Sequence, residues 1–263
     1  MTILDNITYN PDIGKAGLYD LILPGKPGDD CDDLFVYIHG GGIENGDKWG
    51  ERPVFNYLAE HGIACASLNY RMYPNAKFPE FIEDCAKAIA HIMPEGRKVV
   101  NFKRITVGGS SAGGYLSMML FFDPKYLGAY GISPRDIDGW YFDAGQPTTH
   151  FNILDKERGI DPLAIRVDEA APIYFVDHRF EDPDTLPRIH FVWSERDMTA
   201  RPEQTELMIC LLKYYGYPQN KIGQTFMPHN RHCEYVAKSA LFAEMIAGFL
   251  KGFDKCTIAR NVT

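Results

Sequence analysis

The sequence lacks several features that define other classes of protein. It has no excess of basic residues, because its formal net charge is −8 over 263 residues. An acidic balance disfavours nucleic acid and anionic membranes as main partners. No apolar run is long enough to span a bilayer, and the N-terminal segment has neither the basic leader nor the apolar core of a secretory signal. Internal repeats and low-complexity tracts are lacking too.

Paired cysteines and metal-ligand spacings are also missing. The six cysteines are scattered, and none forms a C-x-x-C pair. Without a visible leader they are best explained as reduced thiols, so we expect a cytoplasmic location. One H-x-x-H pair, His229 and His232, has no acidic or cysteine partner at ligand spacing. We therefore expect no metal site.

The composition and the hydrophobic pattern indicate the fold class. Apolar residues make up 45% of the chain and aromatic residues 13%, enough for a sizeable core. Short β-rich apolar runs alternate with segments of helical spacing. The predicted strands are 34–39, 63–70, 105–108 and 188–193, and the predicted helices are 78–92, 113–122, 203–215 and 242–253. This alternation predicts an α/β fold with a mainly parallel sheet and helices on both faces.

The alternation breaks down in one segment, 123–184, which is rich in proline, glycine, aspartate and aromatic residues. We predict a single domain over 1–263, in which this segment is a cap-like excursion over one end of the sheet. Its aromatic residues leave a homodimer contact open. Within it, the polar stretch from Gln146 to His150 has two interpretations: it lines an acyl or alcohol site, or it is a turn with internally bonded side chains.

The strongest motif is G-x-S-x-G, formed by Gly109, Ser111 and Gly113 between a predicted strand and a predicted helix. A nucleophilic serine on a sharp strand-to-helix turn needs small neighbours, because Cβ atoms would collide there. The helix N-terminus also favours negative charge developing on the substrate oxygen. Ser110 lacks the symmetric glycines. Ser111 is therefore the predicted nucleophile.

A second motif, His39-Gly-Gly-Gly42, follows the first predicted strand. Consecutive glycines let backbone N–H groups approach a substrate oxygen closely. The predicted oxyanion-hole donors are the N–H groups of Gly41, Gly42 and Ala112. Loss of one such donor typically removes about 3 kcal/mol of transition-state stabilisation.

A serine nucleophile needs an acid and a base, and the chain offers several candidates. Asp197 lies just beyond a predicted strand, where α/β enzymes place catalytic groups. Glu195 is the runner-up, and Asp143 is a weaker third. His232 is preferred as the base over His229, because the stretch after it leads toward an apolar helix. Ser111, Asp197 and His232 then follow in the chain order Ser, Asp, His that the elbow motif predicts.

These motifs together resemble a known group of enzymes. The glycine run followed by Gly46-Asp-Lys48, then Asn69-Tyr-Arg71, then Gly108-Gly-Ser-Ser-Ala-Gly-Gly-Tyr-Leu116, is similar to hormone-sensitive-lipase-like and acetyl- or feruloyl-esterase-like carboxylesterases of the α/β-hydrolase superfamily. The resemblance implies a serine esterase that acts on small-molecule carboxylic esters through an acyl-enzyme. It implies short-acyl or aryl substrates, including acetyl or feruloyl groups on plant-derived saccharides, and no cofactor. It also implies that Tyr70, Arg71 and Asp84 brace the catalytic loops.

The sequence departs from this group in two places. The first predicted strand begins at Leu34, so the N-terminal cap of many relatives is short here, and we expect segment 123–184 to roof the pocket instead. Ile43 follows the glycines where arylformamidase-like relatives have tryptophan. An amidase or peptidase using the same three residues stays the near alternative. A non-catalytic ligand-binding member would require a missing catalytic residue, and none is missing.

Overall fold

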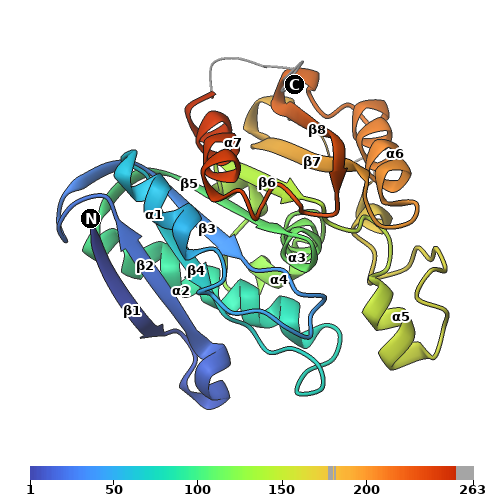
Figure 1. The fold of residues 1–263 in the computed structure, drawn as a ribbon, viewed down its shortest axis with the longest axis horizontal. Helices are drawn as coiled ribbons and strands as arrows, with labels where there is room; N and C mark the ends of the chain where they lie inside the picture. The colour runs from blue at the N-terminus through green and yellow to red at the C-terminus, as the bar shows by residue number, and fades with distance from the viewer. Residues whose placement is uncertain (177–179, 181, 253–263) are drawn as a thin grey trace.

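Eight strands form one sheet in the part of the chain that the computed structural model describes, residues 1–176, 180 and 182–252 (Figure 1). Their order is β1-β2-β4-β3-β5-β6-β7-β8. The pairs β1/β2 and β2/β4 are antiparallel, and every other pair is parallel. The strands are β1 (Thr2–Thr8), β2 (Leu18–Leu23), β3 (Asp30–Ile38), β4 (Ala64–Leu68), β5 (Asn101–Ser110), β6 (Gly139–Asp143), β7 (Arg188–Arg196) and β8 (Ile222–Arg231).

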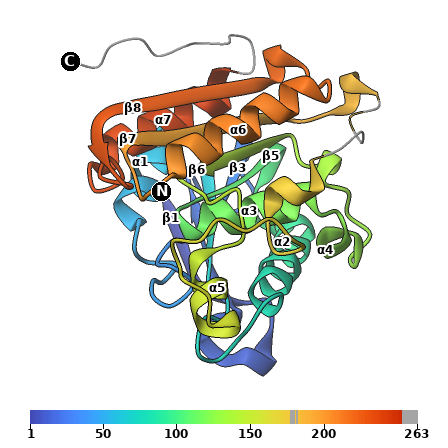
Figure 2. The same cartoon turned by 90° about the vertical axis from the view of Figure 1, so that its right-hand side faces the viewer.

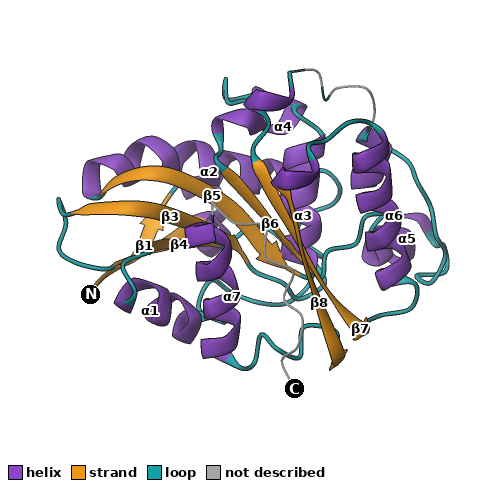
Figure 3. Ribbon diagram, turned by 90° about the horizontal axis from the view of Figure 1, so that it is seen from above, coloured by secondary structure: helices purple, strands orange, loops and turns teal. Residues whose placement is uncertain are grey.

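Helices cover both faces of the sheet, as Figure 3 shows from above. Buried residues of α2, α3 and α6 share one hydrophobic cluster, and those of α1 and α7 form the other. Figure 2 shows α6 beside the β7 and β8 edge. The helices are α1 (Arg52–Glu60), α2 (Glu80–Val99), α3 (Ala112–Phe122), α4 (Lys125–Gly128), α5 (Phe151–Arg158), α6 (Arg201–Tyr214) and α7 (Ser239–Lys251). The predicted α/β fold class is confirmed.

The position of β3 at the centre of the sheet explains the continuous apolar run in its second half. All five residues from Leu34 to Ile38 are fully buried, and β5 pairs with β3 over most of its length. Parallel strands covered on both faces cannot alternate polar and apolar residues. Both strands end at the same edge of the sheet, so the residues that follow Ile38 and Ser110 meet there.

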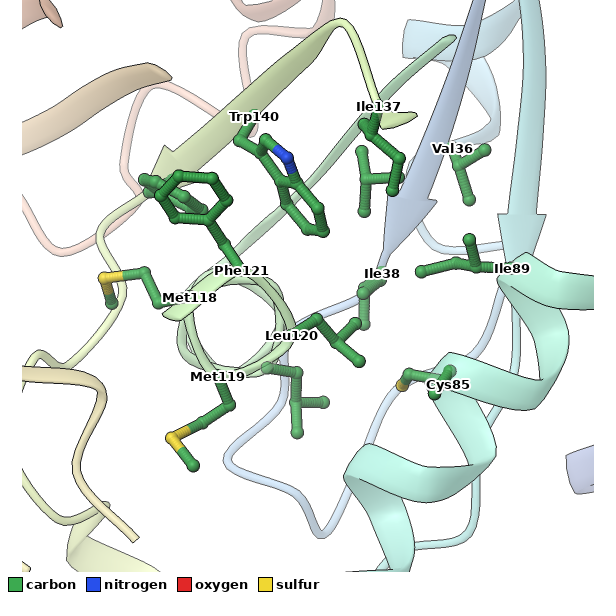
Figure 4. Close-up of a cluster of buried hydrophobic side chains, with 14 of the residues drawn as sticks. Val36, Ile38, Cys85, Ile89, Met118, Met119, Leu120, Phe121, Ile137 and Trp140 are labelled. Carbon is green, nitrogen blue, oxygen red and sulfur yellow. The ribbon is translucent and has the colours of Figure 1, made fainter. Parts of the chain in front are cut away.

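Helix α3 is the core helix of the molecule. All of its residues, from Ala112 to Phe122, are buried, and Figure 4 shows Met118, Leu120 and Phe121 projecting from it in different directions among the neighbouring side chains. A helix that is apolar on every side belongs in a core rather than at a surface. This packing fixes the helix N-terminus that follows Ser111.

Most predicted elements are confirmed with shifted ends. Helix 78–92 is α2, which runs on to Val99, with Glu80 and Glu83 in its first turn and Arg97 and Lys98 in its last. These charges complement the helix dipole. The predicted helix 242–253 corresponds to α7, which begins earlier, and its last predicted residue, Phe253, lies outside the described residues.

Segment 123–184 differs from its predicted role as an excursion. It contains β6, which lies between β5 and β7 in the middle of the sheet. The strand was missed because its Gly-Trp-Tyr-Phe-Asp sequence is short and lies among turn-forming residues. Only the part after β6, which includes α5, leaves the strand–helix alternation. Figure 1 shows α5 at the margin of the molecule.

The residues before β3 also differ from expectation. Instead of a short cap, they form β1 and β2, which extend the sheet through antiparallel pairing. Helix α1 and strand β8 were not predicted either. Among the described residues, no helix is both long and apolar enough to cross a membrane.

Candidate active site

Ser111 stands on a strained turn between β5 and α3. Its backbone has φ 56° and ψ −116°, a conformation that non-glycine residues rarely adopt. A Cβ on Gly109 would lie 2.3 Å from the Ile38 carbonyl oxygen, and one on Gly113 would lie 1.9 Å from the same atom. Both glycines are therefore required by close contact between the turn and the end of β3. The observed turn has the geometry expected of a nucleophile elbow.

The structure brings Ser111, His232 and Asp197 into one hydrogen-bonded chain. Ser111 Oγ lies 2.8 Å from His232 Nε2, and His232 Nδ1 lies 2.6 Å from Asp197 Oδ1. Because a carboxylate accepts hydrogen bonds, Nδ1 carries the proton and Nε2 is free to accept the one from Ser111. The Asp197 side chain is fully buried, and the backbone N–H of Met198 donates to it at 2.7 Å. Such a chain can remove a proton from a serine hydroxyl.

The two runners-up, His229 and Glu195, bind each other instead. Glu195 Oε2 accepts the backbone N–H of His229 at 2.6 Å and lies 3.1 Å from its Nδ1. Both side chains are exposed, His229 by 80% and Glu195 by 44%. The contact with the His229 backbone lowers the pKa of the Glu195 carboxyl. The rings of His229 and His232 thus face different acids.

The third candidate acid, Asp143, lies at the end of β6 and is fully buried. Its carboxyl accepts hydrogen bonds from Ser110 Oγ and from the Tyr235 hydroxyl, and its backbone oxygen accepts the N–H of Ser111 at 2.8 Å. Burial raises the pKa of Asp143 to about 7, although the two hydrogen bonds oppose that rise. Asp143 and Ser110 therefore lie behind the elbow and support it, with no hydrogen bond to His232.

The glycine loop lies beside the elbow, where the sequence placed the oxyanion hole. Ala112 is the first residue of α3, so its N–H has no partner within the helix. Among the described residues, no hydrogen bond is found from the N–H groups of Gly41 and Gly42. Both glycines have positive φ, and a Cβ on Gly41 would lie 1.9 Å from the Asn45 carbonyl oxygen. The loop can therefore present N–H donors only with glycine at this position.

Side chains that follow β4 in the sequence support the start of the glycine loop. Tyr70 donates its hydroxyl to the His39 carbonyl at 2.9 Å and stacks on the His39 ring at 4.5 Å between centroids. Arg71 binds both oxygens of Asp84, through Nε at 2.8 Å and Nη2 at 2.9 Å. These contacts are of the bracing kind that the resemblance implies for Tyr70, Arg71 and Asp84.

Helix α5 also contacts the glycine loop, through residues that we did not predict from the sequence. Asn152 Nδ2 donates to the Gly42 carbonyl and, at 2.9 Å, to Glu44. One turn further along, Lys156 pairs with Glu44 at 2.6 Å. Positions i and i+4 share a helix face, so both side chains reach the loop together. A lone asparagine has no local sequence signal, which is why it was missed.

A pocket of about 400 Å³ opens beside Ser111. We call it the glycine-loop pocket. Its acidic lining residues are Asp47 and Glu51, and the rest of its lining consists of the glycine loop, Gly46, Gly50, Ser110, Ser111, His232, Cys233 and Val236. Burial raises the pKa of the Glu51 carboxyl. The sulfur of Cys233 lies 3.7 Å from His232 Nε2. The pocket has room for one substituent of an ester.

The stretch from Gln146 to His150 is a buried turn whose polar side chains are hydrogen-bonded. Gln146 Nε2 donates to the Thr149 carbonyl at 2.9 Å, and Thr148 donates to Gln204 at 2.8 Å. His150 caps α5 by accepting the N–H of Asn152. The turn interpretation describes Gln146, which bonds within the stretch, whereas Thr148 and Thr149 donate to Gln204 and Asp168 outside it. Gln146 also lines a second pocket, beside Met198.

Comparisons with known proteins agree with this geometry. Residues 19–125, which include the glycine loop and Ser111, match the BD-FAE family model. The probable carboxylic ester hydrolase LipM of Mycobacterium tuberculosis is 38% identical over 97 residues, which are 35% of this chain and 22% of that protein. Mouse hormone-sensitive lipase is 32% identical over 108 residues, 39% of this chain and 13% of that protein. The matched segments thus span less than a quarter of these relatives.

Solved structures extend the likeness in fold to nearly the whole chain. Esterase B from Lactobacillus Rhamnosis (HN001) superposes with a TM-score of 0.75 at 18% identity, covering 96% of this chain and 85% of that one. The chain therefore has the fold class of the α/β hydrolases, with Ser111 on the strand-to-helix elbow. Within that class, the sequence is similar to the hormone-sensitive-lipase-like carboxylesterases, as its motifs predicted.

Proposed function

We propose that the protein is a serine esterase that hydrolyses carboxylic esters through an acyl-enzyme. The observation that carries this proposal is the hydrogen-bonded chain from Ser111 through His232 to Asp197, built on an elbow with positive φ. The ester-hydrolase names of the relatives support the same activity, although their matches cover only part of each protein.

In the proposed reaction, His232 accepts the Ser111 proton while Oγ forms a bond to the ester carbonyl carbon. Asp197 keeps the proton of the imidazole on Nδ1, directed at its own carboxylate, and stabilises the imidazolium that forms. The N–H groups of Gly41, Gly42 and Ala112 receive the developing oxyanion. His232 then protonates the departing alcohol, and water cleaves the acyl-enzyme by the same steps.

The finer proposals concern substrate and location. We propose short-acyl or aryl esters, with acetyl or feruloyl groups on plant-derived saccharides as candidates, because the motifs resemble esterases of that kind. A pocket of about 400 Å³ suits a group of this size. A cytoplasmic location and a homodimer stay predictions from the sequence.

Hydrolysis of 4-nitrophenyl esters from acetate to butyrate tests the central proposal. We expect turnover by the wild type and a loss of roughly 10⁴-fold or more in kcat for Ser111→Ala. Ser133→Ala is the control, because Ser133 is exposed and, among the described residues, bonds only to its own turn, and it should keep most of the activity. No turnover by the wild type on any of these esters, or full activity in Ser111→Ala, would refute the proposal. A 4-nitroanilide series run in parallel distinguishes an esterase from an amidase.

A further inference from the structure

A second pocket, of about 260 Å³, is charged differently from the glycine-loop pocket. We call it the Arg201 pocket; its lining includes Gln146, Phe151, Leu163, Met198 and Arg201. Arg201 is the sole charged residue among the described residues that line it, whereas the glycine-loop pocket is lined by the acids Asp47 and Glu51.

Arg201 is a buried cation with neutral partners. Its residue is only 4% exposed. Nη1 donates to the Ala144 carbonyl at 2.7 Å, and Nη2 donates to Gln146 Oε1 at 3.2 Å and contacts Met198 Sδ at 3.6 Å. A buried charge is costly unless an opposite charge accompanies it, and among the described residues no carboxylate binds this guanidinium. Burial accordingly lowers the pKa of Arg201, while the nearby Asp197 charge opposes that shift.

The position of Arg201 adds to its positive charge. It is the first residue of α6, a helix of fourteen residues. Among the described residues, no side chain caps the N-terminus of this helix. A helix N-terminus carries a partial positive charge and unpaired N–H groups. A planar guanidinium with free N–H donors is suited to bind a carboxylate through two parallel hydrogen bonds.

The Arg201 pocket adjoins the candidate active site. Met198 follows Asp197 directly in the chain, and both Met198 and Thr199 line the pocket. Phe151 also lines it, and the Phe151 ring lies 3.5 Å from where a Cβ on Gly42 would stand. The Arg201 pocket is therefore lined by residues that adjoin both the catalytic acid and the glycine loop, on which a substrate at Ser111 would lie.

We propose that the Arg201 pocket binds a carboxylate carried by the ester substrate, so that the enzyme prefers esters with a second, acidic group. This inference rests on the proposed esterase function. The lining of the glycine-loop pocket supports it, because the Asp47 carboxylate would repel the same group there. The acidic group thus also sets the direction in which the ester lies across Ser111.

Two matched pairs of esters test this preference and show which half of the substrate carries the acid. Ethyl hydrogen glutarate against ethyl pentanoate places the carboxylate in the acyl half. The acetate ester of 4-hydroxybenzoate against that of 4-hydroxybenzamide places it in the alcohol half. Hydrolysis is followed at constant pH by titration of the released acid. In one of the pairs we expect kcat/KM for the charged ester to exceed that for the neutral ester by roughly tenfold or more, as charge-assisted binding predicts.

Two variants assign the preference to the pocket. Arg201→Met should remove the preference and lower kcat/KM mainly for the charged ester. Because Arg201→Met also removes the hydrogen bonds to Ala144 and Gln146, which hold the fold together, Leu163→Glu provides a second test. Leu163 is 67% exposed and lines the pocket, and a carboxylate there should repel the charged ester selectively. Tyr214→Glu adds the same charge at the far, exposed end of α6 and should change neither ester.

The outcomes separate this inference from the proposed function. If neither neutral nor charged esters are hydrolysed, the proposed function fails. If neutral esters are hydrolysed and no charged ester is preferred, the function stands and the inference is overturned. A preference that survives both Arg201→Met and Leu163→Glu overturns it as well.

Discussion

Two histidine–carboxylate pairs lie at the ends of β7 and β8, and they differ in burial rather than in chemistry. His232 and Asp197 bind each other beneath the surface, with the Asp197 side chain fully buried and His232 24% exposed. His229 and Glu195 form a similar pair in the open. Only the buried pair reaches a serine, through His232 Nε2.

The difference in burial between the two pairs shows that a histidine acts as a general base only when its carboxylate partner holds it in place. An exposed pair is weakened by water and salt, so its geometry is loosely held. A buried carboxylate fixes the tautomer and the direction of its histidine. Asp143 extends the comparison, because it is fully buried yet bound to hydroxyl groups instead of an imidazole.

The largest effect is expected from replacing the two histidines, because only one of them is the proposed base. We expect His232→Ala to lower kcat on 4-nitrophenyl acetate by roughly 10⁴-fold or more, since the Ser111 proton then has no acceptor. His229→Ala is the matched control and should stay within about twofold to threefold. Steady-state kinetics on both variants, with circular dichroism to verify folding, measures the difference. Comparable losses in the two would contradict the assignment.

The buried acid Asp197 should also matter for catalysis, with a somewhat smaller loss of kcat than His232. Asp197→Asn keeps the size of the side chain but presents a donor to His232 Nδ1, which favours the wrong tautomer. We expect kcat to fall by roughly 10³- to 10⁴-fold. A variant with near wild-type kcat would show that another acid orients His232, and Asp143→Asn would then be the next variant to assay.

Asp143 predicts an effect on stability that depends on pH. Its pKa is raised from an ordinary value of about 4 to about 7, so the native state holds a proton that the unfolded chain releases. Its contribution to the free energy of unfolding is greatest at low pH, and it falls by about 1.4 kcal/mol per pH unit as pH rises from about 4 to 7.

Urea unfolding across this pH range measures the effect of Asp143. Relative to the wild type, Asp143→Asn should gain stability steadily from pH 4 to 7 and change no further above pH 7. The exposed Asp155→Asn is the control, and its difference from the wild type should show no such slope. A flat difference for Asp143→Asn would refute a raised pKa.

The smallest effect is expected at Glu195. Its pKa is lowered by the His229 backbone N–H, so its contribution is present above the ordinary pKa of about 4 and is lost as pH falls below it. Because the pair is exposed, Glu195→Gln should leave kcat/KM within about twofold and shift the thermal midpoint little. A loss approaching that of Asp197→Asn would contradict the division between buried and exposed pairs.

Much of the fold was predictable because the central strands and helices carry strong local patterns. The buried run from Leu34 to Ile38 and the helical spacing in α2 both reflect burial in this sheet. Strands β1 and β8 were missed because they are edge strands, which are only partly buried and show weak hydrophobic patterns. Strand β2 was missed although it is buried between β1 and β4. Strand β6 was missed because five residues give too short a run to stand out from the turns around it.

The elbow and the glycine loop were also predictable from sequence, since steric needs there act over a few neighbouring residues. Gly109 and Gly113 are glycine because each touches the Ile38 carbonyl oxygen, and a motif search detects that need directly. The chain order of Ser111, Asp197 and His232 narrowed the candidates for acid and base further.

Only the tertiary structure decided how those candidates pair. His229 and His232 are three residues apart, and their sequence contexts do not reveal which ring turns toward Ser111. The contacts of Asn152 with the glycine loop and the neutral surroundings of Arg201 likewise depend on segments far apart in the chain. Local sterics determine a motif, whereas burial and charge pairing are properties of the assembled fold, so they appear only once the segments have packed together.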